Sequence, residues 1–324
     1  MSNKQSIISA TMAIRQSIHR LTKHTKIKHL HFLTAVVLLF ACFVSSCKKE
    51  FEENTPDASN AAKSARLNGT ISPANSMIYL VQNGSLYAVN ASDFQDFTKL
   101  GNNWYGTAQT IASDGASIYA IQSGHIWQTN RFTGEYKQFG NGNWNGSLGV
   151  TGVAGFADEQ GNMFAQAGDY LWRIDLFGVH HKLGEAGWSG TKAVFYHRGN
   201  LYVVWKNGYL YKVNSKNGTW QELTGGWGNV NAIAAPYSTG DRIYIIENGN
   251  LWEVNTNTNI KPRGDVKYLK SGFTNTKAMT GVNGHLYVAS NNCLHKVDLT
   301  GKKVMTNLHY GGITAMGSVK GTFN

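Results

Sequence analysis

A hairpin pattern recurs six times between residue 71 and the end of the chain, and this repeat limits the fold more than any other feature. The first arm of each copy contains an aromatic residue, at Tyr79, Tyr119, Phe164, Tyr202, Tyr244 and Tyr287. The second arm contains Leu or Ile followed by an aromatic residue or His, at Leu86-Tyr87, Ile126-Trp127, Leu171-Trp172, Leu210-Tyr211, Leu251-Trp252 and Leu294-His295. The turn pairs between the arms are Asn83-Gly84, Ser123-Gly124, Gly168-Asp169, Asn207-Gly208, Asn248-Gly249 and Asn291-Asn292. Asn-Gly accepts the positive φ angles of a type I′ turn, so the pattern predicts hairpins at fixed offsets.

The length of the repeat predicts the architecture. First-arm aromatic residues are 38 to 45 residues apart, so six units of about 42 residues fill residues 71–324 and leave no room for a second domain. One unit contains three or four short strands and cannot bury its apolar faces alone, whereas sheets repeated around a circle can. The sequence therefore predicts an all-β fold, a six-bladed β-propeller over residues 71–324.

The end of the chain predicts how the ring closes. The segment 311–319 resembles the segment that precedes each hairpin, for example 276–282, yet the chain stops soon after it. We expect this C-terminal strand to complete the blade whose hairpin begins near Met77.

The N-terminus has the pattern of a targeting signal. Residues 1–31 are basic, and residues 32–44 are apolar over 13 positions, which is short for a membrane span and typical of a signal peptide. The run ends in Val44-Ser45-Ser46-Cys47, which resembles the lipobox of bacterial lipoproteins. The resemblance implies a signal peptide over residues 1–46 and a lipid on Cys47 that holds the protein at a membrane.

Residues 47–70 are polar, rich in Ser and Ala and without periodicity, so they are expected to form a flexible tether behind the lipid. The charged residues 48–53 resemble the signal that sends some Bacteroidota lipoproteins to the cell surface. The predicted location is the outer membrane, at the cell surface or facing the periplasm.

Charge argues against a nucleic-acid partner. The formal charge of +11 includes six basic residues and no acid in residues 1–46, which leaves 24 basic and 19 acidic residues in the rest. Those 24 form no basic stripe, so no nucleic acid is expected as a partner.

A third aromatic column lies before each new unit, at Trp104, Trp144, Trp188, Trp227, Phe273 and Tyr310. Around Trp188 the run Leu183-Gly184, Gly187-Trp188-Ser189-Gly190, Gly199-Asn200-Leu201-Tyr202 and Leu210-Tyr211-Lys212 resembles a repeat of tachylectin-2-like β-propeller lectins and, more loosely, of tectonin-type propellers. Those lectins have five blades and bind N-acetylated amino sugars between adjacent blades. The resemblance implies a non-catalytic carbohydrate-binding protein whose ligands are such sugars or a polysaccharide. The residues expected to bind them are Trp104, Trp144, Trp188, Trp227, Asn103, Asn145, Ser189 and Asn229. Phe273 and Tyr310 replace Trp, so their corners are weaker candidates.

Alternatives to the lectin remain open. A Trp ring can stack on the apolar face of a sugar, but at a blade boundary it can also fill the wedge between two sheets. The fold also suits a protein–protein interaction scaffold of the cell envelope. A propeller hydrolase or lyase is the third alternative. However, His180 and His181 are adjacent in a predicted strand and so point to opposite faces, and the acids lie mainly in turns. No catalytic residue, metal site or cofactor is expected.

Overall fold

The computed structural model describes residues 76–101, 111–113, 116–142, 144, 149–151, 162–257, 264–308 and 310–319. The chain separates into two units, Met1–Asn60 and Ala61–Asn324, and all the described residues belong to the second. The predicted signal peptide, Cys47 and the predicted tether lie outside the described residues and stay predictions. Within the described ranges no helix is long and apolar enough to cross a membrane.

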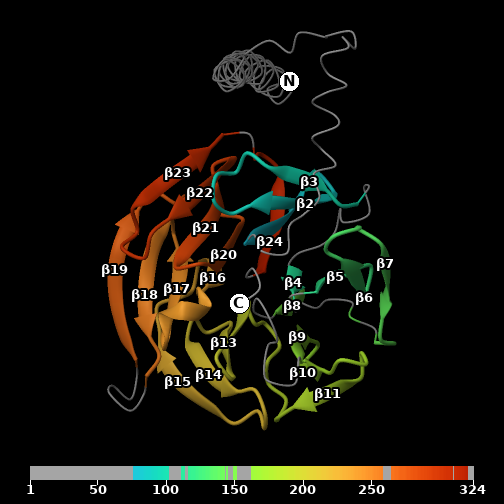
Figure 1. The fold of residues 1–324 in the computed structure, drawn as a ribbon. Helices are drawn as coiled ribbons and strands as arrows, with labels where there is room; N and C mark the ends of the chain where they lie inside the picture. The colour runs from blue at the N-terminus through green and yellow to red at the C-terminus, as the bar shows by residue number, and fades with distance from the viewer. Residues whose placement is uncertain are drawn as a thin grey trace, which may run out of the picture. The chain divides into compact units, whose positions relative to one another are not determined.

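Six antiparallel four-stranded sheets are arranged in a circle, so the predicted six-bladed propeller is confirmed (Figure 1). The strands of each blade are named in order from the innermost to the outermost. Blade 1 contains β24 (Ile313–Val319), β1 (Met77–Gln82), β2 (Ser85–Asn90) and β3 (Phe97–Lys99). Blade 2 contains β4 (Ile111–Ser113), β5 (Ser117–Gln122), β6 (His125–Asn130) and β7 (Tyr136–Phe139). Blade 3 contains β8 (Gly149–Thr151), β9 (Met163–Ala167), β10 (Tyr170–Ile174) and β11 (His180–Leu183).

The remaining three blades follow the same order. Blade 4 contains β12 (Ala193–His197), β13 (Asn200–Val204), β14 (Leu210–Asn214) and β15 (Trp220–Thr224). Blade 5 contains β16 (Val230–Ala234), β17 (Arg242–Glu247), β18 (Asn250–Asn255) and β19 (Asp265–Ser271), with the short helix η1 (Tyr237–Thr239) between its first two strands. Blade 6 contains β20 (Ala278–Val282), β21 (His285–Ser290), β22 (Cys293–Val297) and β23 (Lys303–Asn307).

The C-terminal strand closes the ring as predicted. Strand β24 pairs antiparallel with β1, and Tyr79 lies opposite Gly317 in the register. The last strand of the chain is therefore the innermost strand of the first blade, between β20 of blade 6 and β4 of blade 2. This interlock joins the two ends of the propeller in one sheet.

Turn geometry explains four of the six predicted hairpins. Both central residues have positive φ, as a type I′ turn requires, at Asn83-Gly84, Ser123-Gly124, Asn248-Gly249 and Asn291-Asn292. The prediction of a type I′ turn is wrong for the other two. In blade 3 only Gly168 has positive φ. In blade 4 the connection is longer, because Trp205 pairs with Tyr209 and only Gly208 of the Asn-Gly pair has positive φ.

A further column of Asn and Asp residues shapes the outer turn of every blade. These residues lie four positions after the second-arm Leu or Ile, at Asn90, Asn130, Asp175, Asn214, Asn255 and Asp298. In each, the side-chain Oδ1 accepts a hydrogen bond from the backbone N–H two residues later. Such turns start locally, because Asn and Asp can mimic a backbone acceptor.

The first-arm aromatic residues are buried between blades, and tyrosine hydroxyls join one blade to the next. The Tyr287 hydroxyl donates to the Ala91 carbonyl at 2.8 Å, and the Tyr202 hydroxyl lies 2.8 Å from Thr256 Oγ1. Burial raises the pKa of Tyr202 to about 12, so this hydroxyl keeps its proton. The core is thus a series of interfaces between neighbouring blades.

Candidate functional site

The backbone of each described Trp of the third column is fixed to the hairpin of the blade that precedes it. We call these positions the corners. The N–H of the corner residue donates to a turn carbonyl: Trp144 to Gly124 at 2.8 Å, Trp188 to Asp169 at 3.1 Å, Trp227 to Gly208 at 2.9 Å, and Phe273 to Gly249 at 3.0 Å. The corner therefore starts from one blade, and its side chain is directed toward the next.

The side chains of these Trp residues pack on the following blade. Their partners are second-arm aromatic residues: Trp144 meets Trp172, Trp188 meets Tyr211 and Trp227 meets Trp252, with ring centroids 5.8–6.2 Å apart in edge-to-face geometry. Between 3% and 7% of each corner Trp is exposed, which leaves no open ring face for a sugar. At these three corners the Trp fills the wedge between sheets. Trp104, Asn103 and Asn145 lie outside the described residues.

The predicted polar companions Ser189 and Asn229 are exposed, but their backbone groups have structural partners. The Ser189 N–H donates to Asp169 Oδ1 at 3.0 Å, and the Asn229 N–H donates to Glu247 Oε1 at 2.9 Å. The bond from Ser189 lowers the pKa of Asp169, so this side chain stays an anion that holds the corner. Their role in binding stays a prediction.

Lysine and tyrosine take part in the two corners that lack Trp. Phe273 is fully buried, and Lys303 Nζ lies 4.9 Å from its ring centroid while donating to the Gly272 carbonyl at 2.9 Å. Tyr310 is also buried, and its hydroxyl donates to the Phe94 carbonyl at 3.3 Å. Phe273 and Tyr310 are therefore packed between blades, like the three described Trp corners.

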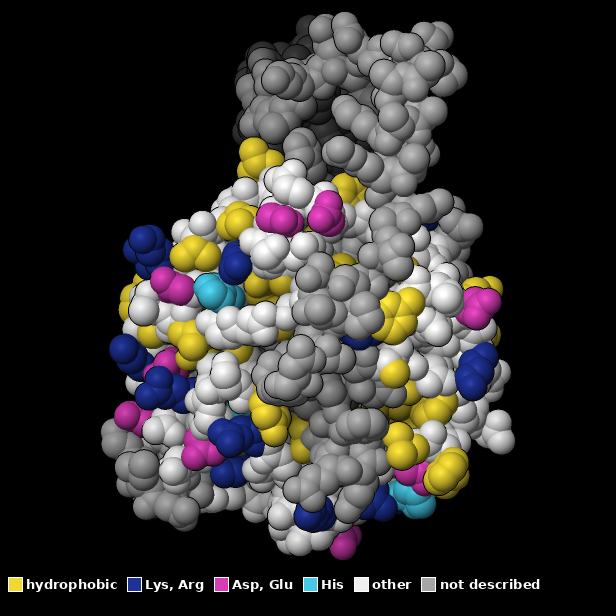
Figure 2. All heavy atoms as spheres, viewed as in Figure 1, with side chains coloured by type: hydrophobic (Ala, Val, Ile, Leu, Met, Phe, Trp, Pro, Cys, Tyr) yellow, Lys and Arg dark blue, Asp and Glu magenta, His cyan; other side chains and the backbone are white. Residues whose placement is uncertain are grey.

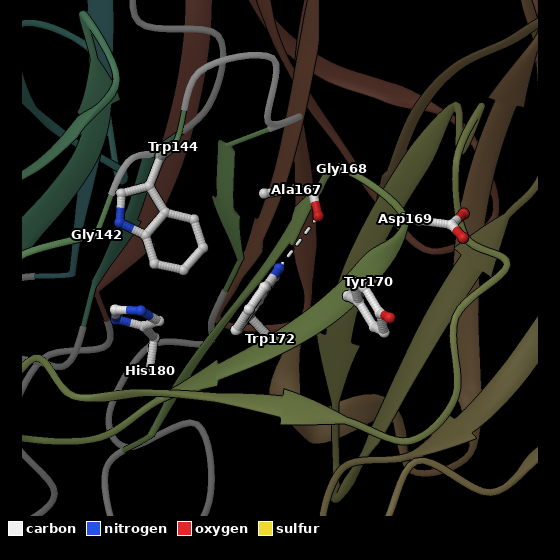
Figure 3. Close-up of a pocket in the computed structure, with 8 residues that line it drawn as sticks. All are labelled: Gly142, Trp144, Ala167, Gly168, Asp169, Tyr170, Trp172 and His180. Carbon is white, nitrogen blue, oxygen red and sulfur yellow. Dashed lines mark hydrogen bonds between the residues drawn. The ribbon is translucent and has the colours of Figure 1, made fainter.

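One corner opens into a cavity of about 390 Å³, at the junction of blades 2 and 3 (Figure 3). Its lining residues are Gly142, Trp144, Ala167, Gly168, Asp169, Tyr170, Trp172 and His180. The volume is in the range of small-molecule sites, which begins at roughly 300 Å³.

Three rings at nearly right angles form its wall. His180 lies 5.6 Å from Trp144 and 5.5 Å from Trp172, measured between ring centroids. The Trp172 indole N–H donates to the Ala167 carbonyl at 3.1 Å, which fixes that ring in place. Gly142 lets Trp144 lie close, because a Cβ there would be 2.5 Å from Trp144 Nε1.

At the position of Ala167, three other blades have a longer side chain that bonds to its corner. In blade 1 the equivalent Gln82 donates to the Gly311 carbonyl of its corner, in blade 4 Trp205 donates to the Ser189 carbonyl, and in blade 5 Glu247 accepts from Asn229. The methyl group of Ala167 cannot reach the corner at Trp144. Space that these side chains occupy in blades 1, 4 and 5 therefore stays open beside Ala167.

A charged side chain, Lys182, lies beside the cavity, whereas Asp169 and His181 are directed elsewhere. Lys182 Nζ lies 3.9 Å from the ring centroid of Tyr170, and the Asp169 carboxylate points away toward the next corner (Figure 3). His181 does not join His180, because it turns to the opposite face and meets Asp175 Oδ2 at 3.3 Å. In the described part of the chain no three His, Cys, Asp or Glu residues gather as a metal site.

Sequence reasoning found one residue of this cavity, Trp144, and missed the rest of its wall. Trp172 belongs to the repeat pattern, but its role was assigned to the hairpin alone. The signal that could have located the cavity is Ala167, a small residue in a column that otherwise reads Gln82, Gln122, Trp205, Glu247 and Ser290.

The fold and this junction define the class of the protein: a six-bladed β-propeller, a fold consistent with a non-catalytic binding scaffold. Among solved structures it is similar to a chain of a nidogen/laminin complex, with a TM-score of 0.63 and 14% identity over 75% of this chain and 98% of that chain. A protein of unknown function from Bacteroides caccae is similar with a TM-score of 0.52 and 13% identity, over 76% and 99% of the two chains. These likenesses show the fold alone. No family model matches the chain, and no curated protein matches its sequence.

Proposed function

We propose that this propeller is a lectin-like, non-catalytic carbohydrate-binding protein, and that its sugar occupies the cavity between blades 2 and 3. The observation that carries the proposal is the open aromatic wall of Trp172, Tyr170 and His180 beside Trp144. The resemblance of the repeat around Trp188 to tachylectin-2-like lectins agrees with it.

The chemistry of the cavity suits a pyranose. The apolar C–H face of the ring stacks on an aromatic side chain, while its hydroxyl groups need a few fixed polar partners. Tyr170 and Trp172 are half-buried, so parts of both rings are accessible, and Lys182 and His180 provide polar groups beside them. Ala167 gives the cavity a small apolar surface, which matches the methyl of an N-acetyl group. N-acetylated amino sugars, or a polysaccharide that contains them, are therefore the proposed ligands.

A glycan array on the full chain, with Cys47→Ser to prevent lipidation, tests the proposal. The decisive variant is Ala167→Gln, because the Gln of blade 1 fills this position and reaches its own corner. We expect Ala167→Gln to remove binding of the glycans that the wild type retains, and the control Ala167→Ser to keep it. Retention of no glycan by the wild type, or equal retention by Ala167→Gln, would show that the cavity is not a sugar site.

We also propose that a lipid on Cys47 anchors the protein in the outer membrane, at the cell surface or facing the periplasm. The support is the lipobox-like run that ends at Cys47. Mass spectrometry of the mature protein checks this, since the expected N-terminus is a diacylated Cys47 and Cys47→Ser should leave the signal peptide in place. An unmodified N-terminus elsewhere would contradict the anchor.

One observation favours a second function, a scaffold that binds an envelope protein. The turn between β10 and β11 exposes Leu176, Phe177 and Val179, and 86% of Phe177 is accessible. Figure 2 shows hydrophobic side chains at the lower right edge, beside a histidine, where this turn lies. The variant Leu176→Ser/Phe177→Ser should then lose a crosslinked envelope protein and keep glycan binding. An unchanged crosslinking pattern would remove this alternative.

A further inference from the structure

A pair of aromatic side chains recurs on the two outer strands of five blades. Each pair joins a second-arm aromatic residue to one on the outermost strand, in edge-to-face geometry with centroids 5.2–6.3 Å apart. The pairs are Tyr87 with Phe97, Trp127 with Tyr136, Trp172 with His180, Tyr211 with Trp220, and Trp252 with Tyr268. We call the five outer-strand members the rim aromatics.

The rim aromatics are exposed although they lie on strands at the edges of sheets. Between 44% and 58% of Phe97, Tyr136, Trp220 and Tyr268 is accessible. Proteins usually protect sheet edges with charged or polar side chains, so a large ring there is a liability for a blade. Blade 6 shows that the fold does not need it, because His295 of that blade meets Thr306 through a 2.8 Å hydrogen bond instead of a second ring.

Long polar side chains stand beside these rings. Lys99, Gln138, Lys182 and Glu222 pair in register with Tyr87, Trp127, Trp172 and Tyr211 respectively. Residues opposite each other in an antiparallel pair share a face of the sheet. Each of these four second-arm aromatic residues therefore has two neighbours on its own face of the sheet, an exposed rim aromatic and a hydrogen-bonding or charged side chain.

The polar residues beside the exposed rings indicate which kind of partner these rings can bind. A protein partner needs a contiguous buried core, and a lipid surface needs a contiguous apolar one, whereas single rings beside a polar residue, as in blades 1, 2 and 4, provide neither. A sugar has both an apolar C–H face and hydroxyl groups around it. Single rings with polar neighbours, repeated on several blades, match a repeating chain of sugars.

We propose that the rim aromatics are subsites for a polysaccharide, whose chain contacts several blades in addition to the cavity. The pair Trp172 and His180 of blade 3 also lines the cavity, so the rim continues the site of the proposed function. The inference rests on that function for its ligand class and extends it from one sugar to a polymer. Several weak contacts on one rigid propeller raise the affinity for a polymer without any single strong site.

The competing explanation is that the pairs only stabilise the sheets, since cross-strand aromatic pairs do so. The test compares polymer with short sugar by affinity electrophoresis in glycol chitin, mannan, xylan, laminarin, dextran and polygalacturonate. The protein is the full chain with Cys47→Ser, and each polymer that retards it is compared with its own disaccharide as a competitor. The rim variant is Tyr136→Thr/Trp220→Thr/Tyr268→Thr, which keeps β-forming residues on the strands. The matched control is Val304→Thr, an exposed residue of the outermost strand of blade 6.

We expect the rim variant to lose at least tenfold in affinity for the polymer, with less than a twofold change for the disaccharide and no change for Val304→Thr. Undiminished polymer affinity of the rim variant overturns the proposal, as does a wild type that no polymer retards or that binds polymer no better than disaccharide. If Ala167→Gln leaves polymer binding intact while the rim variant abolishes it, the cavity proposal fails and the rim stands. Should the triple variant unfold, Trp220→Thr and Tyr136→Thr alone are each expected to lower polymer affinity about threefold, and no loss in either overturns the proposal.

Discussion

Replacing Trp188 by alanine separates the two interpretations of the corner Trp residues, because one predicts lost stability and the other lost binding. Trp188 belongs to a buried cluster with Phe164, Leu183 and Leu201, and only 7% of it is accessible. Its ring also meets Tyr211 at 5.8 Å and Trp220 at 6.5 Å. Removing such a side chain leaves a void between blades 3 and 4 that the two rigid sheets cannot close.

The expected loss for Trp188→Ala is about 3–5 kcal/mol in the free energy of unfolding, which is typical for a buried Trp. For a unit of this size that lowers the Tm by about 10 °C. The matched control is Trp220→Ala, which removes a ring of the same kind that contacts Trp188 but is mostly exposed, and should cost about 1 kcal/mol or less. Urea unfolding followed by far-UV circular dichroism measures both.

A Trp188→Ala protein as stable as the wild type would refute the packing argument. If it also lost the glycans that the wild type binds, Trp188 would be a ligand residue, and its buried position would not represent the bound state. Equal destabilisation by both variants would refute the assignment of Trp188 to the core and Trp220 to the surface.

Three further results are expected. Gly178→Ala should cost about 1–3 kcal/mol more than Gly199→Ala in urea unfolding, because both residues have positive φ but only at Gly178 would a Cβ approach the Gly140 nitrogen, at 2.6 Å; equal losses would contradict the close contact of blades 2 and 3. Burial lowers the pKa of His295 to about 4, so the folded protein binds fewer protons than the unfolded chain between pH 6.5 and pH 4 and loses stability as pH falls through this window. His295→Tyr, which copies Tyr87 and Tyr211, should reduce the loss between pH 7 and pH 4.5 by about 1–2 kcal/mol, whereas an unchanged pH profile would contradict it. Deleting residues 311–324 should abolish cooperative unfolding, because β1 then has no inner partner, and a peptide of residues 309–324 should restore it; a truncated chain that unfolds like the wild type would disprove the interlock.

The hairpins and the closing strand could be predicted from the sequence because both depend on local patterns. Asn83-Gly84 forms the turn that its residues favour, although the same pair at Asn207-Gly208 lies in a longer connection, and the segment 311–319 has the residues of an inner strand. The column that begins with Asn90 was open to the same reasoning, since each member lies four residues after the second-arm Leu or Ile. Local chemistry favours these features, so comparing the repeats with one another is enough to predict them.

The exposure of the corner Trp residues could not be predicted, because it depends on contacts between repeats. A Trp at position 227 is equally compatible with an open groove and with the edge of Trp252, and only the spacing of the two blades decides. Variable turns and bulges obscured the rim aromatics as well. Strand β19 contains an irregularity opposite Leu251 and Trp252, which shifts Tyr268 from the position that a fixed offset from the corner would predict.

Stability and the proposed binding depend on different residues at the junction of blades 2 and 3. Trp144 joins the blades through its backbone bond to Gly124 and its contact with Trp172, and Trp188 and Trp227 do the same at their corners. What differs is the side chain that reaches the corner from blades 1, 4 and 5, which at Ala167 is a single methyl group. Blade 3 keeps its four strands without that longer side chain. The described Trp corners are therefore structural, and the small residue Ala167 marks the junction where we propose that a ligand binds.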